Sequence, residues 1–264
     1  MARILVLAFL CAPVLCQAAT AFFFPASAGV DEAGIPRLRS PAASIVVLYT
    51  PGSDSNTTMV CYPGASVPPV FRNLAGTLVN GNELVVVGYC PDAVGNLDRD
   101  LSMSEARVPE LQQRVRSLLE EGVPSQHLFI AGHSMGGWAA VRVGLQQEPA
   151  VAGVIAFAPA NGINRRANRT AGNLRALYRE QHALEGHSSL NALVYTFAGD
   201  ENAEPESLAF LSGFPGVQMV QWPAPAAGAQ GDPHFTVLRQ PDFASQESGR
   251  ILDFIRRHSA AHAP

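Results

Sequence analysis

Lysine is absent from this sequence, so all 18 of its basic residues are arginines. Without a lysine amine the chain cannot form a Schiff base with a carbonyl substrate, and it cannot build a serine–lysine dyad. The lysine of a P-loop is missing as well, which excludes that route to nucleotide hydrolysis. What remains is chemistry carried by hydroxyl, imidazole and carboxylate groups.

Charge of either sign is also scarce. Only 15% of the residues are charged, 47% are hydrophobic, and the formal net charge is −4. A globular protein has such a composition, and a slightly acidic chain has no electrostatic reason to bind nucleic acid or an anionic membrane. With 264 residues the chain suffices for one domain with a full core. We expect one domain that acts on small neutral molecules.

No apolar run reaches the ~20 residues of a membrane-spanning helix. The run Ile4–Leu15 follows a basic Arg3 and precedes the small residues Ala18, Ala19 and Ala21. This pattern is typical of a secretory signal peptide. We predict that residues 1–21 are a signal peptide and that residues 22–264 form an exported domain, periplasmic or extracellular, with no stable membrane anchor. The alternative is that the run is a buried first strand or helix.

Cysteine is rare, with four in the chain. Removal of the leader would take Cys11 and Cys16 and leave Cys61 and Cys90 in an oxidising compartment. We predict a disulfide between these two, with two separate buried thiols as the alternative, because sequence alone does not give their distance.

Short β-branched runs alternate with segments of helical periodicity from residue 43 onward, which predicts an α/β fold with a mostly parallel open sheet flanked by helices. Most of the runs are continuously apolar, as in strands covered on both faces. The predicted strands are Ser44–Tyr49, Glu83–Tyr89, His127–Ala131, Val151–Ala158, Asn191–Ala198 and Val217–Trp222.

Apolar residues recur at helical spacing between these strands, which predicts helices over 70–79, 108–119 and around 251–255. Pro109 suits the first turn of the second helix, or else kinks it, and Gly122 is placed to end it. The polar, arginine-rich stretch 161–189 lies outside the alternation. We interpret it as a surface crossover helix, with a small cap as the alternative.

A possible nucleophile lies where a predicted strand meets a predicted helix. The run Gly132-His133-Ser134-Met135-Gly136-Gly137 has the G-x-S-x-G pattern of a nucleophile elbow, in which a sharp turn raises the serine above the sheet. A bare G-x-S-x-G also occurs in accidental glycine-rich turns, but its place after an apolar strand favours the elbow. Ser134 is therefore the predicted nucleophile.

A serine hydroxyl needs a histidine base, and a carboxylate must orient that base. Of seven histidines, His234 follows the last predicted strand, where the chain order serine, acid, histidine requires the base. Asp200 ends the preceding strand and is the predicted acid. His133 lies beside the nucleophile and cannot face it correctly, and Asp232 is interpreted as a turn residue.

The oxyanion of a tetrahedral intermediate needs two hydrogen-bond donors. The backbone N–H of Met135, in the first turn of the elbow helix, is the predicted first donor. The second should come from the loop after the first predicted strand. Since Pro51 has no N–H, Ser53 is the predicted donor and Gly52 the alternative.

These motifs resemble those of the α/β-hydrolase superfamily, and within it the dienelactone-hydrolase-like and cutinase-like serine esterases. The Gly-His-Ser-Met-Gly-Gly run resembles the cutinase elbow, Pro51-Gly52-Ser53 their oxyanion loop, and His234-Phe235 their histidine loop. Those oxyanion loops usually carry an aromatic residue where Ser53 stands.

The resulting hypothesis is a serine hydrolase that cleaves small carboxylic esters through an acyl-enzyme, without metal or organic cofactor. A peptidase, amidase or acyltransferase on the same triad is one alternative. A non-catalytic binding protein with a hydrolase fold is another. Three aromatic residues could line a substrate pocket, although the core is the preferred interpretation for each: Tyr49, Trp138 and Trp222.

Overall fold

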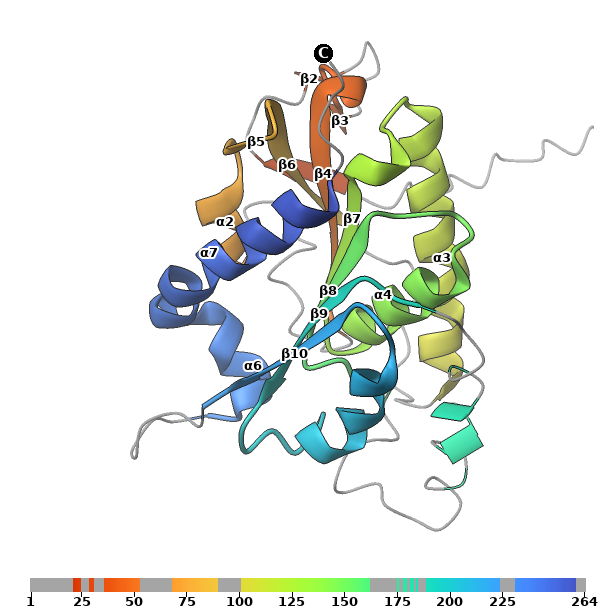
Figure 1. Ribbon diagram of the computed structural model, residues 1–264, viewed down its shortest axis with the longest axis vertical. Coiled ribbons are helices and arrows are strands. Elements are labelled where there is room, and N and C mark those ends of the chain that lie inside the picture. Colours follow the sequence, from red (N-terminus) through yellow and green to blue (C-terminus); the bar gives the residue numbers. More distant parts are fainter. Residues whose placement is uncertain are drawn as a thin grey trace, which may run out of the picture.

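A central sheet between two layers of helices organises the chain (Figure 1). The computed structural model describes residues 21–24, 29–30, 36–52, 68–89, 101–161, 175, 178–179, 181–182, 184, 189–223 and 231–259. Side chains are described from residue 38 onward, except for those of residues 101–105.

The described strands form an eight-stranded sheet in the order β1-β6-β4-β7-β8-β9-β10, with β5 also paired to β6. The pairs from β6 through β10 are parallel, whereas β1 and β5 run antiparallel to β6. A separate two-stranded sheet joins β2 and β3. The strands are β1 Ala21–Phe24, β2 Gly29–Val30, β3 Pro36–Arg37, β4 Ser44–Thr50, β5 Leu78–Val79, β6 Asn82–Tyr89, β7 Leu128–His133, β8 Gly153–Phe157, β9 Ala192–Phe197 and β10 Val217–Trp222.

The six predicted strands are all present, with ends that differ by two residues or fewer. Every residue of β4, β8 and β9 is buried, as expected for strands covered on both faces. The edge strand β10 is only partly buried, and its glutamines Gln218 and Gln221 are exposed. The predicted α/β class with a mostly parallel sheet is confirmed.

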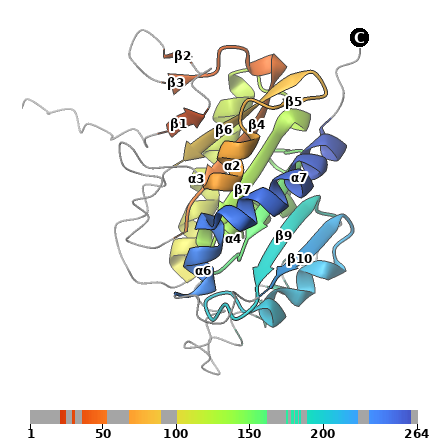
Figure 2. The same ribbon diagram turned by 90° about the vertical axis from the view of Figure 1, so that its left-hand side faces the viewer.

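Among the elements that the structure describes, two helices pack on each face of the sheet. In Figures 1 and 2, α2 Pro69–Leu74 and α7 Pro241–His258 lie on one side, and α3 Leu101–Glu120 and α4 Met135–Gln146 lie on the other. The short α6, Pro233–Thr236, precedes α7. The 3₁₀ segments are Pro41–Ala43, Ser125–His127, Pro205–Gly213 and Val237–Arg239.

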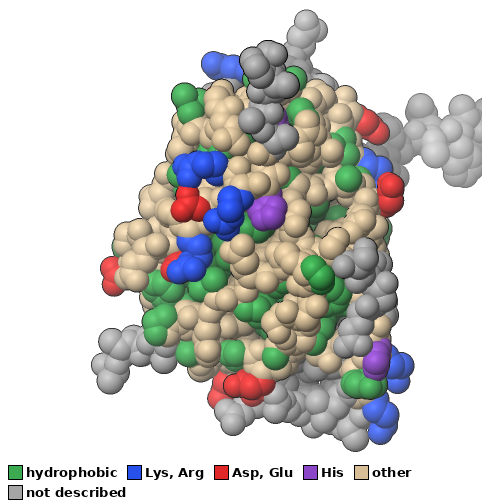
Figure 3. Space-filling view, in the orientation of Figure 1, with side chains coloured by type: hydrophobic (Ala, Val, Ile, Leu, Met, Phe, Trp, Pro, Cys, Tyr) green, Lys and Arg blue, Asp and Glu red, His purple; other side chains and the backbone are tan. Residues whose placement is uncertain are grey.

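The long helix α7 is amphipathic. Its inner face buries Phe243, Ile251 and Phe254, and its buried Glu247 accepts a 2.9 Å hydrogen bond from the Tyr195 hydroxyl of β9. Its last turn carries Arg256, Arg257 and His258, which suit the negative end of a helix dipole. Figure 3 shows basic side chains and a histidine gathered over this helix.

Two helix predictions are wrong at one end. The helix predicted over 70–79 ends at Leu74, because Asn80 and Gly81, with φ of 51° and 83°, form a two-residue hairpin turn between β5 and β6. Asn-Gly favours this turn. The helix predicted from Val108 begins at Leu101 and continues through Pro109. The apolar spacing that predicted this helix starts at Val108 in the sequence, so it did not indicate the first two turns.

Several predictions fall on residues that are not described. Residues 1–20 of the predicted signal peptide, both cysteines of the predicted disulfide (Cys61 and Cys90) and most of 161–189 are among them. The choice between crossover helix and cap stays open, although described residues within 175–184 are helical. In the described part of the chain, no helix combines the length and apolarity needed to cross a membrane. Tyr49, Trp138 and Trp222 are buried in the core, as preferred.

Candidate active site

The predicted functional residues meet at one edge of the sheet, where its parallel strands have their carboxyl ends. Ser134 follows β7, Asp200 follows β9, and the loop after β10 leads to His234 in α6. The loop after β4 brings Gly52 to the same edge. Ligands of open α/β sheets bind at this edge, because loops from several strands converge there.

Ser134 occupies a strained turn between β7 and α4. Its φ of 55° and ψ of −125° lie in a region that non-glycine residues seldom adopt, at a cost of about 1–3 kcal/mol. The surrounding backbone holds it there: the Ser134 amide donates to the Phe157 carbonyl at 3.0 Å, and the Ala160 amide donates to the Ser134 carbonyl at 2.9 Å. This is the geometry that the G-x-S-x-G motif predicts.

Two glycines make this turn sterically possible. A Cβ on Gly132 would lie 2.4 Å from the backbone of Gly136, and a Cβ on Gly136 would lie 2.3 Å from the carbonyl oxygen of Thr50. Real Cβ atoms do not approach backbone atoms so closely, so α4 can start this near to β4 and β7 only with glycine at both positions.

His234 is hydrogen-bonded to both other members of the predicted triad. Its Nε2 lies 2.8 Å from Ser134 Oγ, and its Nδ1 lies 2.8 Å from Asp200 Oδ2. Ser134, Asp200 and His234 are 7%, 1% and 2% exposed. The structure therefore brings the three residues together in a chain of hydrogen bonds shielded from water. A base in this position can receive the serine proton.

Asp200 is held by more than the histidine. Its other oxygen, Oδ1, accepts hydrogen bonds from the backbone amides of Asn202 at 2.7 Å and Ala203 at 2.9 Å. The carboxylate can therefore present only Oδ2 to His234. The neighbouring Glu201 is exposed.

Asp232 and Asn202 connect the loop of the acid to the loop of the base. Asp232 is the N-cap of α6 and accepts from the His234 amide at 2.9 Å, while its second oxygen accepts from the Asn202 side-chain amide. Asp232 thus has the turn role that the sequence predicted. The sequence analysis missed Asn202, whose only signal was an amide two residues after the acid.

His133, rejected as the base, supports the base instead. Its Nε2 donates to the backbone carbonyl of His234 at 2.7 Å, and the two rings lie 4.7 Å apart. Burial, together with the nearby His234, lowers the pKa of His133 well below the usual value of 6.5. A neutral ring suits this position, because a second cation would oppose protonation of His234.

Of the predicted oxyanion donors, the structure describes Met135 and the alternative Gly52, but not Ser53. Met135 is the first residue of α4, so its amide has no acceptor within the helix. Gly52 lies against the nucleophile, since a Cβ on it would be 2.9 Å from Ser134 Cβ and 3.5 Å from Ser134 Oγ. Ser53 lies outside the described residues, so its role stays a prediction.

Arg107 is a further residue that sequence reasoning missed. It projects from α3, is 2% exposed, and donates to the carbonyls of Pro51 and Gly52 at 2.6 and 3.0 Å. Burial lowers the pKa of its guanidinium to about 10, so it remains charged at neutral pH. Its only sequence signal was an arginine one position away from an apolar helical stripe.

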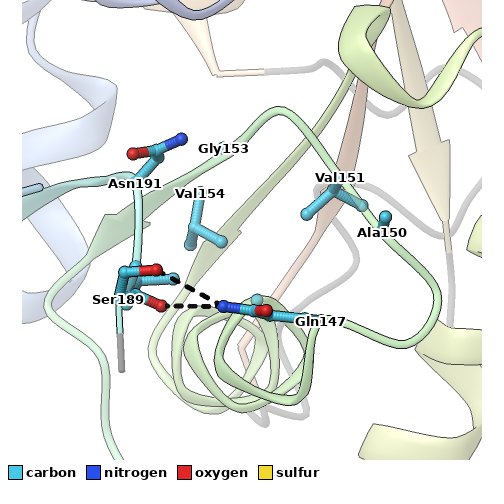
Figure 4. A pocket seen from close by; sticks show the side chains of 9 residues that line it. Gln147, Ala150, Val151, Gly153, Val154, Ser189 and Asn191 are labelled. Atoms are coloured by element: carbon cyan, nitrogen blue, oxygen red, sulfur yellow. Dashed lines mark hydrogen bonds between the residues drawn. The ribbon is translucent and has the colours of Figure 1, made fainter. Parts of the chain in front are cut away.

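A cavity of about 270 Å³ lies at the opposite edge of the sheet (Figure 4). Its walls come from the amino-terminal ends of β8 and β9 and from the end of α4, where Gln147 is bonded to Ser189. The lining residues are all uncharged. This cavity is therefore separate from the candidate site and holds no group for acid–base chemistry.

Solved structures share this arrangement of sheet and helices. Esterase PE8 aligns with 89% of this chain and 99% of its own length, at 16% identity and a TM-score of 0.54. By fold, this chain is an α/β-hydrolase. A phospholipase/carboxylesterase from Dyadobacter fermentans aligns with 89% of this chain and 97% of its own length (13% identity, TM-score 0.52). Est1E from Butyrivibrio proteoclasticus, solved with ferulic acid bound, aligns over 90% and 92% (11% identity, TM-score 0.51).

Comparison of the sequence with protein families gives a match over a shorter part of the chain. Residues 105–196 of this chain match a family model described as serine aminopeptidase, S33. No curated protein matches the chain by sequence. The α/β-hydrolase fold that the motifs predicted is confirmed, and two of the structural neighbours named above are called an esterase and a phospholipase/carboxylesterase.

Proposed function

We propose that this protein is an exported serine hydrolase that cleaves small carboxylic esters through an acyl-enzyme. The observation that carries the proposal is the continuous hydrogen-bonded chain from Ser134 Oγ through the His234 ring to Asp200. A serine at a strained elbow, with a base already within 2.8 Å, is arranged for nucleophilic attack. The names of the similar solved structures favour an ester as the substrate.

Acylation would proceed in two steps. His234 Nε2 takes the hydroxyl proton as Ser134 Oγ attacks the ester carbonyl carbon, and the carbonyl oxygen becomes an oxyanion facing the Met135 amide. When the intermediate collapses, the bond to the alcohol oxygen breaks. The proton on Nε2 then passes to the departing alcohol, leaving the acyl group on Ser134. Asp200 stabilises the imidazolium throughout.

Deacylation would repeat these steps with water. His234 removes a proton from the water that attacks the acyl carbon, and a second tetrahedral oxyanion forms. Its collapse breaks the bond to Ser134 Oγ, which recovers its proton from Nε2, and the carboxylic acid leaves. The alcohol leaves with the original proton of Ser134 and water supplies its replacement, so Ser134 and His234 end the cycle in the protonation states in which they began.

A panel of aryl esters of increasing acyl length tests the proposal. We expect wild type to prefer short to medium chains and to be labelled by a fluorophosphonate. Ser134→Ala should lose labelling, and both Ser134→Ala and His234→Ala should lose turnover by at least about 10³-fold. Exposed His182 provides a matched control, and His182→Ala should behave like wild type. Equal turnover by wild type and Ser134→Ala would refute a covalent mechanism on Ser134.

Hydrolysis of peptides from the amino end is a second candidate, favoured by the description of the matching family model. The same assays decide between the two when aminoacyl aryl amides are added to the panel. A kcat/KM higher for the amides than for the esters would favour the peptidase. Export is tested separately by expressing the full chain and a form lacking residues 1–21, and locating each by fractionation.

A further inference from the structure

A buried cation lies behind the loop that follows β4. Arg107 is 2% exposed, and no carboxylate lies within 4 Å of its guanidinium among the described residues. Its hydrogen-bond acceptors among the described residues are two backbone carbonyls, and its Nε has no hydrogen-bond partner in that part of the chain. Burying this charge is costly for folding, and the attraction of the nearby Glu110 offsets only part of the desolvation, since burial still lowers the pKa of Arg107. A purely structural role could be filled by an apolar side chain at a lower cost.

The two hydrogen bonds fix the direction of the loop backbone. Within a trans peptide the carbonyl and the following N–H point in opposite directions. Because Arg107 Nη1 binds the Pro51 carbonyl at 2.6 Å, the Gly52 amide must point away from the guanidinium. Arg107 Nη2 binds the Gly52 carbonyl at 3.0 Å and so orients the peptide on the other side of Gly52.

The same loop is in contact with the nucleophile. Gly52 approaches Ser134 so closely that no Cβ would fit, and the Pro51 carbonyl lies against Gly136 in the first turn of α4. The loop is therefore held between Arg107 and the elbow. A small rotation of the peptide between Pro51 and Gly52 would therefore change the direction of the Gly52 amide beside the serine.

We propose that Arg107 is a positioning residue for the oxyanion hole: its guanidinium binds the carbonyl side of the loop and thereby directs the amide side toward the oxyanion formed on Ser134. This inference rests on the proposed function and deepens it. A hydrogen bond from a cation also polarises the peptide that accepts it, so the N–H of that peptide becomes a stronger donor. The planar fork of arginine reaches two carbonyls at once, whereas a lysine ammonium would act as a point charge.

The test compares Arg107→Met and Arg107→Lys with Arg116→Met, a control at an exposed position of the same helix. Active sites are first counted by fluorophosphonate titration, so that rates refer to folded enzyme. Two quantities follow: the KM and kcat for an aryl ester, and the Ki of an aryl trifluoromethyl ketone. Addition of Ser134 Oγ to that ketone forms a tetrahedral oxyanion, so its affinity reports the hole directly.

We expect Arg107→Met to lower kcat by about 30- to 100-fold, because displacing a donor by about 1 Å costs up to about 100-fold. Its KM should change by less than about threefold, and its Ki should rise by the same factor as kcat falls. Arg107→Lys should recover part of both losses, and Arg116→Met should match wild type.

The results separate this inference from the proposed function. If wild type neither hydrolyses esters nor reacts with the fluorophosphonate, the proposed function is wrong. If wild type is active and Arg107→Met keeps kcat and Ki within twofold of Arg116→Met, Arg107 does not position the hole. Loss of titratable sites with unchanged kcat and Ki per site would also overturn the inference, because it indicates a role in folding alone. Should Arg107→Met fail to fold, the same comparison is made on Arg107→Lys.

Discussion

Replacing Asp200 by asparagine tests the proposed triad most sharply. Asp200 Oδ1 accepts from two backbone amides, while Oδ2 faces His234 Nδ1. Asparagine has one acceptor oxygen and one amide nitrogen. The two backbone amides can be satisfied only by the oxygen, so the side-chain NH₂ must face His234 Nδ1.

This arrangement would force the histidine into the wrong tautomer. An NH₂ group donates to Nδ1, so Nδ1 loses its proton and Nε2 carries it instead. Protonated Nε2 cannot accept the proton of Ser134. We therefore expect kcat to fall by about 10⁴-fold, the size of this effect in other serine triads, which corresponds to about 5 kcal/mol of transition-state free energy.

The assay is aryl ester turnover at pH 7.5, normalised to folded protein, together with the melting temperature. Asparagine has the shape of aspartate and keeps both backbone hydrogen bonds, so the fold should persist. Glu201→Gln, at the exposed neighbouring carboxylate, is the control and should leave kcat unchanged within about twofold. A kcat for Asp200→Asn above one tenth of wild type would show that Asp200 does not set the tautomer.

Three further substitutions have definite expected outcomes. Gly52→Ala would place a Cβ 2.9 Å from Ser134 Cβ, so kcat should drop by at least about tenfold in the ester assay, and normal turnover would contradict the close approach. Gly136→Ala would force a Cβ onto the backbone of Thr50 and Pro51, so it should lower the free energy of unfolding by more than about 2 kcal/mol. A urea titration measures this loss, and an unchanged midpoint would contradict the close packing. Because the folded pKa of His133 lies below 6.5, the unfolded chain binds more protons below that pH, and stability should decline as pH falls from 6.5. His133→Phe should flatten the fall in melting temperature between pH 6.5 and 5, and an equally steep decline would assign it to other groups.

The sequence predicted those parts of the fold that depend on periodicity and burial. Mostly continuous apolar runs identified five of the six parallel strands, because residues covered on both faces are apolar along nearly their whole length. The sixth, the edge strand β10, carries exposed glutamines and is only partly buried. Prediction from the sequence failed where local turn chemistry or tertiary contacts determine the structure. The pair Asn80-Gly81 turned the end of an expected helix into a hairpin, a signal that was present but overridden by spacing.

The three triad residues could be predicted from their order in the chain and from their positions at the ends of predicted strands, and both can be read from the sequence. The residues that hold the triad in place could not be predicted in this way, because their roles depend on contacts between distant segments. Asn202 and Asp232 are 30 positions apart and join two loops, and Arg107 bonds a loop 55 positions earlier. No local pattern distinguishes such side chains from ordinary polar residues.

These supporting contacts explain why the site needs little rearrangement before reaction. Each of its three loops is fixed by polar groups outside the triad. Arg107 binds the loop after β4, Asn202 and Asp232 connect the other two, and His133 binds the backbone of the base. A preorganised site of this kind stabilises charge in the transition state without first reorienting its dipoles. Substitutions at these positions should therefore act mainly on kcat, with smaller effects on KM, because they disturb the alignment of groups that the substrate meets only as it reacts.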